Sequence, residues 1–400
     1  MRGSPVAIFL VFLRLGCTSF GGPVAHLGYY RAELVAKRGW LTEAAFADIV
    51  ALCQFMPGPA SSQTGMAIGL LRGGPLGMLA AWLGFTLPSA VAMTGFAYGA
   101  SAIGDLSGAG WLRGLMVVAV AVVAQAVWGM GRALAPDRAR ASLAVAACLV
   151  CLTLPTSLGQ IGALILGAVI GTALLPRAAT PFEQTAALEV RIPRWVAVTL
   201  LVIFVALLLG LPWLADASGN HVIRLVDTFY RAGSLVFGGG HVVLPLLQES
   251  VVPPGWVDPD VFLAGYGATQ AMPGPIFTFA AFLGAVETPD PNGWLGALVA
   301  TVSIFGSSFL LVCGLLPFWE TLRHSPTVRA AMSGVNAAVV GVLLAALYSP
   351  IWTGTIHRSA DFGLGLVAFL LLTLWGLPPW CVVALGAAAG WVMAAEGRFG

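Results

Sequence analysis

The sequence Gln54-Phe55-Met56-Pro57-Gly58-Pro59 recurs 216 residues later as Gln270-Ala271-Met272-Pro273-Gly274-Pro275. Upstream of it, the pattern Phe12-x-Arg14-x-Gly16-x-x-x-Phe20-Gly21-Gly22 recurs as Phe229-x-Arg231-x-Gly233-x-x-x-Phe237-Gly238-Gly239. Between these motifs, Glu33 matches Glu249 and Trp40 matches Trp256 in the same order. Ordered motifs at a nearly constant offset indicate two copies of one structural unit, an arrangement typical of many secondary transporters.

Composition places the chain in the membrane class. Charged residues make up 9% of the chain and hydrophobic residues 58%, whereas soluble domains contain about 25% charged residues. Several apolar runs approach the roughly 20 residues that a helix needs to cross a bilayer, and strand patterns are absent. We therefore predict an all-α polytopic membrane protein, with a first repeat at 1–175, a linker with an extra transmembrane span at 176–221, and a second repeat at 222–400.

The charges of matched loops bear on the orientation of the two repeats. The loop at 31–43 carries three basic and two acidic residues, while its counterpart at 240–260 carries three acidic residues and no Lys or Arg. Because cytoplasmic loops are enriched in Lys and Arg, the two loops are expected on opposite sides of the membrane. This favours an inverted repeat with the first loop in the cytoplasm, although the basic residues of 132–140 and Arg358 argue against strict inversion.

The two Pro-Gly-Pro sequences are the main candidates for a substrate site. Proline removes a backbone donor and clashes with the preceding turn, so each apolar segment is expected to stop and restart near the membrane midplane. A restarted helix presents free N–H groups and a partial positive charge, which suit an anion. A kinked packing helix is the alternative interpretation. The expected binding residues are Gln54, Pro57, Gly58, Ser61 and Ser62 in the first repeat, and Gln270, Pro273, Gly274 and Thr278 in the second.

Arg14 and Arg231 are a second signal for an anion. Each lies within an apolar segment, six residues before Phe-Gly-Gly. An arginine inside the bilayer costs at least about 2.5 kcal/mol, so it usually faces a cavity and has a partner. We expect the two side chains to converge on one anion, with snorkelling to the interface as the alternative.

Other residues near these motifs are expected to support the site rather than to hold the anion. Phe-Gly-Gly has no chemistry of its own, but its glycines let backbones approach closely. His26 and His241 follow the two glycine pairs, and each is more typical of a structural histidine than of a proton carrier. Asp48, six residues before Gln54, is expected either to pair with a basic residue or to carry a proton. The supporting set is Phe20, Gly21, Gly22, His26 and Asp48, with Phe237, Gly238, Gly239 and His241 in the second repeat.

The ordered motifs resemble those of the chromate ion transporter (CHR) family, in its long-chain, two-domain type. The resemblance rests on Phe-Gly-Gly, Glu, Gly-Trp, Gln-x-x-Pro-Gly-Pro and Phe85-x-Leu87-Pro88-Ser89, and it covers nearly the whole chain. It implies a multi-pass transporter of the bacterial inner membrane that exports chromate and gives chromate resistance. One departure is that Gly306-Ser307-Ser308 stands where the first repeat has Leu87-Pro88-Ser89, so the two halves are not equivalent.

Three other functions remain open at this stage. Sulfate or another oxyanion has nearly the shape and charge of chromate, and it could move in either direction through the same site. A membrane enzyme such as a chromate reductase would need a cofactor motif or a metal cluster, and we find neither, so no cofactor, no metal and no enzyme activity are expected. A channel is the third. The net charge of +2 gives no indication of nucleic-acid binding, and Gly386-x-x-x-Gly390 leaves a homodimer in the lipid bilayer open.

Overall fold

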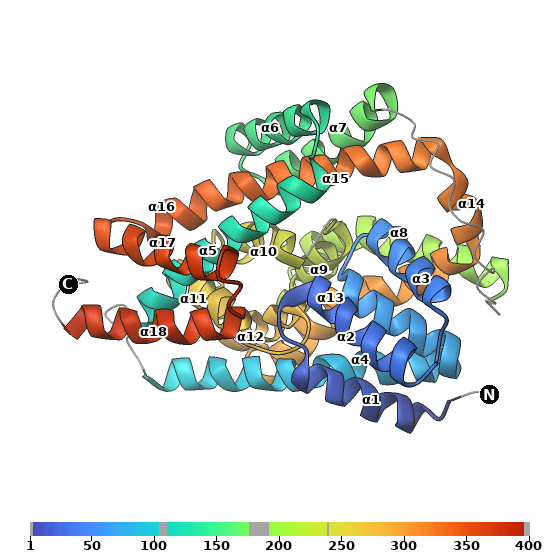
Figure 1. The fold of residues 1–400 in the computed structure, drawn as a ribbon, viewed down its shortest axis with the longest axis horizontal. Coiled ribbons are helices and arrows are strands. Elements are labelled where there is room, and N and C mark those ends of the chain that lie inside the picture. Colours follow the sequence, from blue (N-terminus) through green and yellow to red (C-terminus); the bar gives the residue numbers. More distant parts are fainter. Residues whose placement is uncertain (1–2, 104–109, 176–191, 238–239, 396–400) are drawn as a thin grey trace.

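A computed structural model describes residues 3–103, 110–175, 192–237 and 240–395. Most of these residues are helical, the rest are turns, bends and irregular segments, and no strand occurs among them. The prediction of an all-α fold is therefore confirmed (Figure 1). Gly238 and Gly239, two of the predicted supporting residues, lie outside the described residues.

The helices of the first half are α1 (Pro5–Thr18), α2 (Gly22–Tyr30), α3 (Glu43–Phe55), α4 (Ala60–Ile103), α5 (Gly110–Leu134), α6 (Arg138–Thr153) and α7 (Ser157–Leu174). A linker helix, α8 (Arg194–Ser218), follows. The second half contains α9 (His221–Leu235), α10 (Val243–Val251), α11 (Pro259–Thr269), α12 (Phe279–Val286), α13 (Gly293–Leu315), α14 (Trp319–His324), α15 (Pro326–Ala346), α16 (Thr353–Thr355), α17 (Ser359–Thr373) and α18 (Pro379–Ala395). Five helical stretches among the described residues are long and apolar enough to cross a membrane, so the protein is multi-pass.

The long element α4 is folded back on itself. Gly74 has φ 67° and ψ −159°, and Pro75 follows it. A Cβ added to Gly69 would collide with the carbonyl oxygen of Gly77, although these residues would be about 12 Å apart along a straight helix. The chain therefore forms two antiparallel limbs, which we call the first limb (60–73) and the second limb (75–103). In the second half, α12 and α13 form the matching hairpin, with Gly284 against Gly296.

The helices that follow the two hairpins, α5 and α15, run in opposite directions, and each packs against helices of the other half. Figure 1 shows α5 running from the left of the view to the right, whereas its counterpart α15 runs from α14 on the right to α16 on the left. This opposition is that of an inverted repeat. Helix α5 packs against α17 and α18 of the second half, and α15 packs against α6 and α7 of the first half. Each half therefore completes the packing of the other.

Glycines set the distance between the exchanged helices. Gly110 and Gly114 of α5 face Gly390 and Gly386 of α18, and Gly334 of α15 likewise faces Gly167 of α7. Such small residues let helix backbones approach closely in a membrane. The Gly386-x-x-x-Gly390 pattern is thus used within the chain, and it gives no support for a homodimer.

We expect Gly114→Ala to destabilise the protein by about 1–3 kcal/mol, because an added methyl group overpacks this contact. The added Cβ would collide with the carbonyl oxygen of Gly386. Thermal unfolding of the purified protein in detergent measures the effect. Gly129→Ala in the same helix is the control, because nothing lies within 4 Å of a Cβ at that position. Equal losses in the two variants would show that the α5–α18 contact is not close-packed.

The linker helix α8 covers one side of the second half. It packs against α9 and α13, and the Tyr230 hydroxyl donates a hydrogen bond to the Phe204 carbonyl oxygen at 3.2 Å. Most of its side chains are exposed outward, with only 6% of its apolar window buried. On α1, the counterpart of α9, Arg14 and Cys17 are exposed.

Candidate functional site

Both predicted helix breaks are present. Helix α3 ends at Phe55 and α4 begins at Ala60, while α11 ends at Thr269 and a 3-10 turn at Ile276–Thr278 leads into α12. Gly58 has φ 116° and Gly274 has φ 97°, a region in which residues with a Cβ are strained. Proline on each side removes the amides that would continue the helix. The sequence Pro-Gly-Pro thus determines a sharp interruption at the same position in each repeat.

Each break is held by the opposite repeat. The Gly58 N–H donates to the carbonyl oxygen of Val236 at 2.6 Å, and the Gly274 N–H donates to that of Ser19 at 2.9 Å. Ser19 and Val236 are equivalent positions, each directly before Phe-Gly-Gly. We call this pair of hydrogen bonds the crosswise brace. The expected free donors at Gly58 and Gly274 are therefore engaged with protein, and the brace joins the two most prominent sequence motifs of the chain.

Two serines that sequence reasoning did not select as site residues lie against the brace. A Cβ on Gly274 would be 2.8 Å from the Ser89 Oγ, and one on Gly58 would be 3.2 Å from the Ser308 Oγ. Ser89 ends Leu87-Pro88-Ser89 and Ser308 ends Gly306-Ser307-Ser308. The signal in the sequence was the serine that ends both triplets. It was overlooked because the second triplet lacks the proline of the first.

The start of α4 is rich in polar groups that the protein does not satisfy. The Gln63 N–H donates to the Pro59 carbonyl oxygen at 2.9 Å, so the amides of residues 60–62 precede the intrahelical bonds. Ser61 and Ser62 are both buried. Several buried side-chain atoms around the two breaks have no hydrogen-bond partner in the structure: the hydroxyl oxygens of Ser19, Ser62 and Ser307, the Oε1 of Gln63 and the Nε2 of Gln270. Such groups are normally paired with water or a ligand.

The start of α12 is less open to a ligand. The Thr278 hydroxyl donates to the Pro275 carbonyl oxygen at 2.8 Å, and the Thr278 N–H donates to the same oxygen at 3.0 Å. Gln270 is buried while its counterpart Gln54 is exposed. The two breaks are thus equivalent in backbone but unequal in polar groups.

The two histidines reach the restarted helices by different routes. His26 of α2 is buried, and its Nδ1 lies 3.3 Å from the Ser61 Oγ. The Nδ1 of His241 lies 2.7 Å from the hydroxyl oxygen of Tyr266, whose ring packs against Phe279 at the beginning of α12 with ring centres 5.7 Å apart. Although they are two positions out of register in the sequence, both histidines therefore contact the surroundings of a helix start.

The structure places the two predicted arginines in different environments. Arg14 is exposed on α1, on the side away from the buried residues Phe12 and Leu15. Arg231 is partly buried on α9 and pairs with Asp227, one turn earlier on the same helix. The charge of Arg231 is therefore balanced locally.

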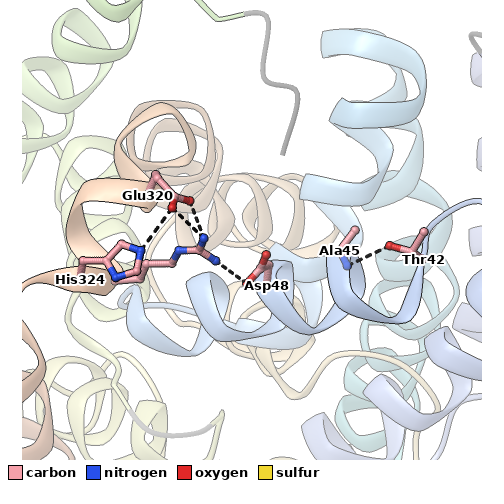
Figure 2. Close-up of polar contacts among 6 residues, drawn as sticks. Thr42, Ala45, Asp48, Glu320 and His324 are labelled. Carbon is pink, nitrogen blue, oxygen red and sulfur yellow. Dashed lines mark hydrogen bonds and ion pairs between the residues drawn. The ribbon is translucent and has the colours of Figure 1, made fainter. Parts of the chain in front are cut away.

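Asp48 takes part in a buried ion pair between the two halves. Its Oδ1 lies 3.0 Å from Nη1 of Arg323 on α14, and both side chains are almost fully buried (Figure 2). Arg323 also donates to Glu320 at 2.7 Å, and the Nε2 of His324 lies 3.2 Å from the same carboxylate. Of the two roles expected for Asp48, pairing with a basic residue is the one observed. Since α3 leads directly into the first break, this pair anchors the approach to the site.

A second ion pair between the halves lies on α5. Arg113 donates to both carboxylate oxygens of Asp361 on α17, at 3.0 and 2.7 Å. Asp361 is fully buried and also accepts from the backbone amides of His357 and Arg358, both at 3.1 Å. These hydrogen bonds and the positive charge of Arg113 hold the pKa of the Asp361 carboxyl below its usual range, against the opposing effect of burial.

An apolar groove lies elsewhere, between the second limb of α4 and the α12–α13 hairpin. It has a volume of about 150 Å³ and is lined by side chains such as Trp82, Val91 and Leu298. A lining of carbon atoms does not suit a multiply charged oxyanion. The polar groups at the two breaks remain the candidate site.

A sequence profile of the family described as "Chromate transporter" matches residues 6–174 and 223–391, which together make up most of the chain. The chain belongs to the chromate transporter family. Each matched region contains one Phe-Gly-Gly and one Pro-Gly-Pro motif, so the crosswise brace joins the two family units. The family is one of transporters, in agreement with the expectation of a membrane protein that is not an enzyme.

Several relatives that are named as chromate transport proteins match most of the chain. The chromate transport protein of Pseudomonas aeruginosa is 29% identical over 84% of this chain and 78% of its own length. A probable chromate transport protein of Synechococcus elongatus is 27% identical over 95% of this chain and 93% of its own length. The chromate transport protein of Cupriavidus metallidurans is 25% identical over 85% of this chain and 81% of its own length. No solved structure shows a significant match to this chain.

Proposed function

We propose that this protein is a secondary transporter that exports chromate across the bacterial inner membrane and so gives chromate resistance. The observation that carries the proposal is the crosswise brace, in which Gly58 and Gly274 each bind the backbone of the opposite repeat. Inverted repeats with interrupted helices at their interface provide the two alternating states that transport needs. The names of the relatives supply the anion.

In this proposal, the start of α4 is the principal anion-binding element. The amides of residues 60–62 and the hydroxyls of Ser61 and Ser62 can donate to the oxygens of a tetrahedral dianion, with the positive end of the helix behind them. In the tautomer with a proton on Nδ1, His26 donates to the Ser61 oxygen and leaves the Ser61 O–H free to donate to the anion. From the second repeat, the unpaired amide nitrogen of Gln270 supplies a further donor.

Arg14 and Arg231 provide the compensating positive charge. An arginine binds an oxyanion through several parallel N–H donors, which a lysine cannot match. Asp227 holds Arg231 in place and balances its charge when no anion is bound. Arg14 has no ion-pair partner in the described part of the chain, so we propose that its exposed side chain meets the anion on entry or exit.

The glycines and prolines of the breaks position these groups. Pro57, Gly58, Pro273 and Gly274 keep the two helix starts at the interface between the repeats, and the glycines of Phe-Gly-Gly allow the backbones to meet there. Gly22 of the first motif and Gly240, which directly follows the second, both lie beside the Ile276 side chain after the second break, with added Cβ atoms at 3.9 and 3.5 Å from its Cδ1. Since one chain supplies both breaks, a homodimer is compatible with the proposal but is not required by it.

Export needs no further energy source if the membrane potential drives it. Moving a dianion out of a cell that is negative inside by 100 mV is favourable by about 4.6 kcal/mol, from about 2.3 kcal/mol per charge. We therefore expect everted membrane vesicles that contain the protein to accumulate radioactive chromate when they are energised. Competition by excess sulfate measures the selectivity. If energised vesicles accumulate no more chromate than vesicles without the protein, the export proposal is wrong.

The roles of the arginines can be tested separately. Arg14→Ala and Arg231→Ala are each expected to reduce chromate transport at least tenfold, about the effect of losing one charge-assisted contact worth 1.5–3 kcal/mol. Protein content of the membranes should stay unchanged. Arg132→Ala removes an exposed arginine at the end of α5 and serves as the control. Normal transport in both site variants would remove the arginines from the site.

A further inference from the structure

Buried Glu287 and partly exposed His221 form a pair at the turn of the α12–α13 hairpin. Glu287 follows the last residue of α12, and His221 is the first residue of α9. The Nε2 of His221 lies 3.2 Å from one carboxylate oxygen of Glu287, and the His221 ring packs edge-on against Trp256 with ring centres 4.6 Å apart. The Glu287 side chain is only about 2% exposed, and its other oxygen has no hydrogen-bond partner in the structure.

In the part of the chain that the structure describes, no arginine or lysine forms an ion pair with Glu287. Within the described residues, His221 is the one ion-pair partner of Glu287. The elements packed nearby carry these charged residues: Arg194 and Asp216 on α8, Arg224, Asp227 and Arg231 on α9, Asp258 and Asp260 at the start of α11, and Asp290 in the following turn. Tyr98 lies against Gly293. Arg224 acts on His221, whose pKa is lowered by burial and by this positive charge. The carboxylate would also lie at the negative end of α12. A protonated carboxyl is the form that this environment accepts.

The first repeat has an opposite arrangement at the equivalent corner. There Trp40 is flanked by Arg38 and Arg72, whose guanidinium groups lie 5.7 and 5.4 Å from the ring centre. In the second repeat Trp256 is flanked by His221, and its carbonyl oxygen accepts from the Thr288 N–H at 3.0 Å. A permanently cationic corner thus faces one side of the protein, and a corner that can take up a proton faces the other.

We propose that Glu287 and His221 form a proton-binding site whose occupancy is linked to the anion held at the two breaks. The link is α12 itself, an eight-residue helix that begins just after Pro-Gly-Pro and ends next to Glu287. Such a helix is rigid and only about 12 Å long, so a dianion held between the start of α4 and Gln270, which directly precedes the second break, and a carboxylate at the far end of α12 repel each other. Anion binding therefore favours the protonated pair. The linkage rests on the proposed function, whereas the proton-binding site does not.

The pKa values define the pH range of the effect. Burial raises the pKa of the Glu287 carboxyl from its ordinary value to about 8. A carboxyl with a raised pKa stabilises the folded state fully below its unfolded pKa of about 4.3, and this contribution is lost as the pH rises through about 8. The pair thus holds its proton at neutral pH and releases it above pH 8.

Two measurements on the purified full-length protein test the proposal. Infrared difference spectra between pH 6 and pH 9 should show the band of a buried protonated carboxyl in the wild type and in Glu43→Gln, which alters an exposed carboxylate. The band should be absent in Glu287→Gln, an isosteric neutral variant. A band retained in Glu287→Gln, or absent from the wild type, would overturn the proton-binding site.

The linkage is tested by adding chromate to weakly buffered protein at pH 8 and recording the pH. We expect net proton uptake by the wild type and none by Glu287→Gln. The affinity for chromate should fall about tenfold between pH 7 and pH 9 in the wild type only, a change within the usual range of coupling between two sites. Equal proton uptake in both proteins would overturn the linkage. A wild type that shows the carboxyl band but binds no chromate would instead contradict the proposed function and leave the proton site supported.

Discussion

Gly58→Ala and Gly274→Ala are each expected to abolish chromate transport. Both glycines have positive φ angles, 116° and 97°, and a residue with a Cβ in such a conformation costs about 1–3 kcal/mol. In addition, the methyl group added at position 58 would collide with the Gln63 side chain, and the methyl group added at position 274 would lie 2.8 Å from the Ser89 Oγ. Relief of either strain moves the N–H away from its partner in the opposite repeat, so the crosswise brace is lost.

The measurement is chromate uptake into energised everted vesicles, with membrane protein content determined in parallel. Gly95→Ala is the matched control, because it lies in the second limb of α4 and nothing is within 4 Å of an added Cβ. The double variant Gly274→Ala/Ser89→Gly removes the side-chain collision but keeps the strained backbone, and it should recover only part of the activity. Wild-type transport by either single variant would mean that the brace is not needed for transport.

Arg323→Ala is expected to destabilise the protein by about 3–5 kcal/mol, the usual effect of removing one member of a buried ion pair. Asp48 and Arg323 are 2% and 5% exposed, and their charged atoms lie 3.0 Å apart. Without the guanidinium, the Asp48 carboxylate would remain buried on α3 (Figure 2), the helix that leads into the first break. The free energy of unfolding therefore falls, and the transport rate falls as well if α3 shifts.

Denaturation of the purified protein in detergent gives the change in free energy of unfolding. Removal of both charges, as in Asp48→Asn/Arg323→Gln, should recover more than half of the loss, because no isolated charge remains buried. Arg31→Ala is the control, since Arg31 and Glu43 form an exposed pair at 2.9 Å and such pairs contribute at most about 1 kcal/mol. A loss for Arg323→Ala as small as that of the control would show that the Asp48–Arg323 pair is solvated in the membrane protein.

Much of the fold could be predicted because the deciding signals are local. Two prolines on either side of a glycine remove two amides and restrict the residues before them, so the breaks at Pro57–Pro59 and Pro273–Pro275 follow from the residues themselves, whereas the single prolines Pro88 and Pro212 remain within helices. The apolar composition determines membrane insertion in the same way. The contrast between basic and acidic loops indicated inversion, and α5 and α15 do run in opposite directions.

The candidate site was only partly predictable. Ser61 and Ser62 are buried at a helix start, as expected from their positions after Pro-Gly-Pro. The serines at 89 and 308 were missed as site residues because they are far from the breaks along the chain and reach them only across the interface. Arg14 and Arg231 occupy equivalent positions in the sequence, yet Asp227 pairs with only one of them. A sequence repeat predicts that two residues occupy equivalent positions of the backbone. It does not predict which side chains surround each of them.

By itself, the sequence determined that this protein is an all-helical membrane protein of two related halves with one interrupted helix in each. Those properties depend on proline, glycine and hydrophobicity, which act within a few residues. Only the tertiary structure decided that each break is braced by the other half and that α5 and α15 exchange partners. Both copies carry nearly the same motifs, so contacts within a repeat and contacts between repeats are compatible with the same residues. The choice between them depends on which backbones the glycines allow to meet, and that is a property of the folded chain.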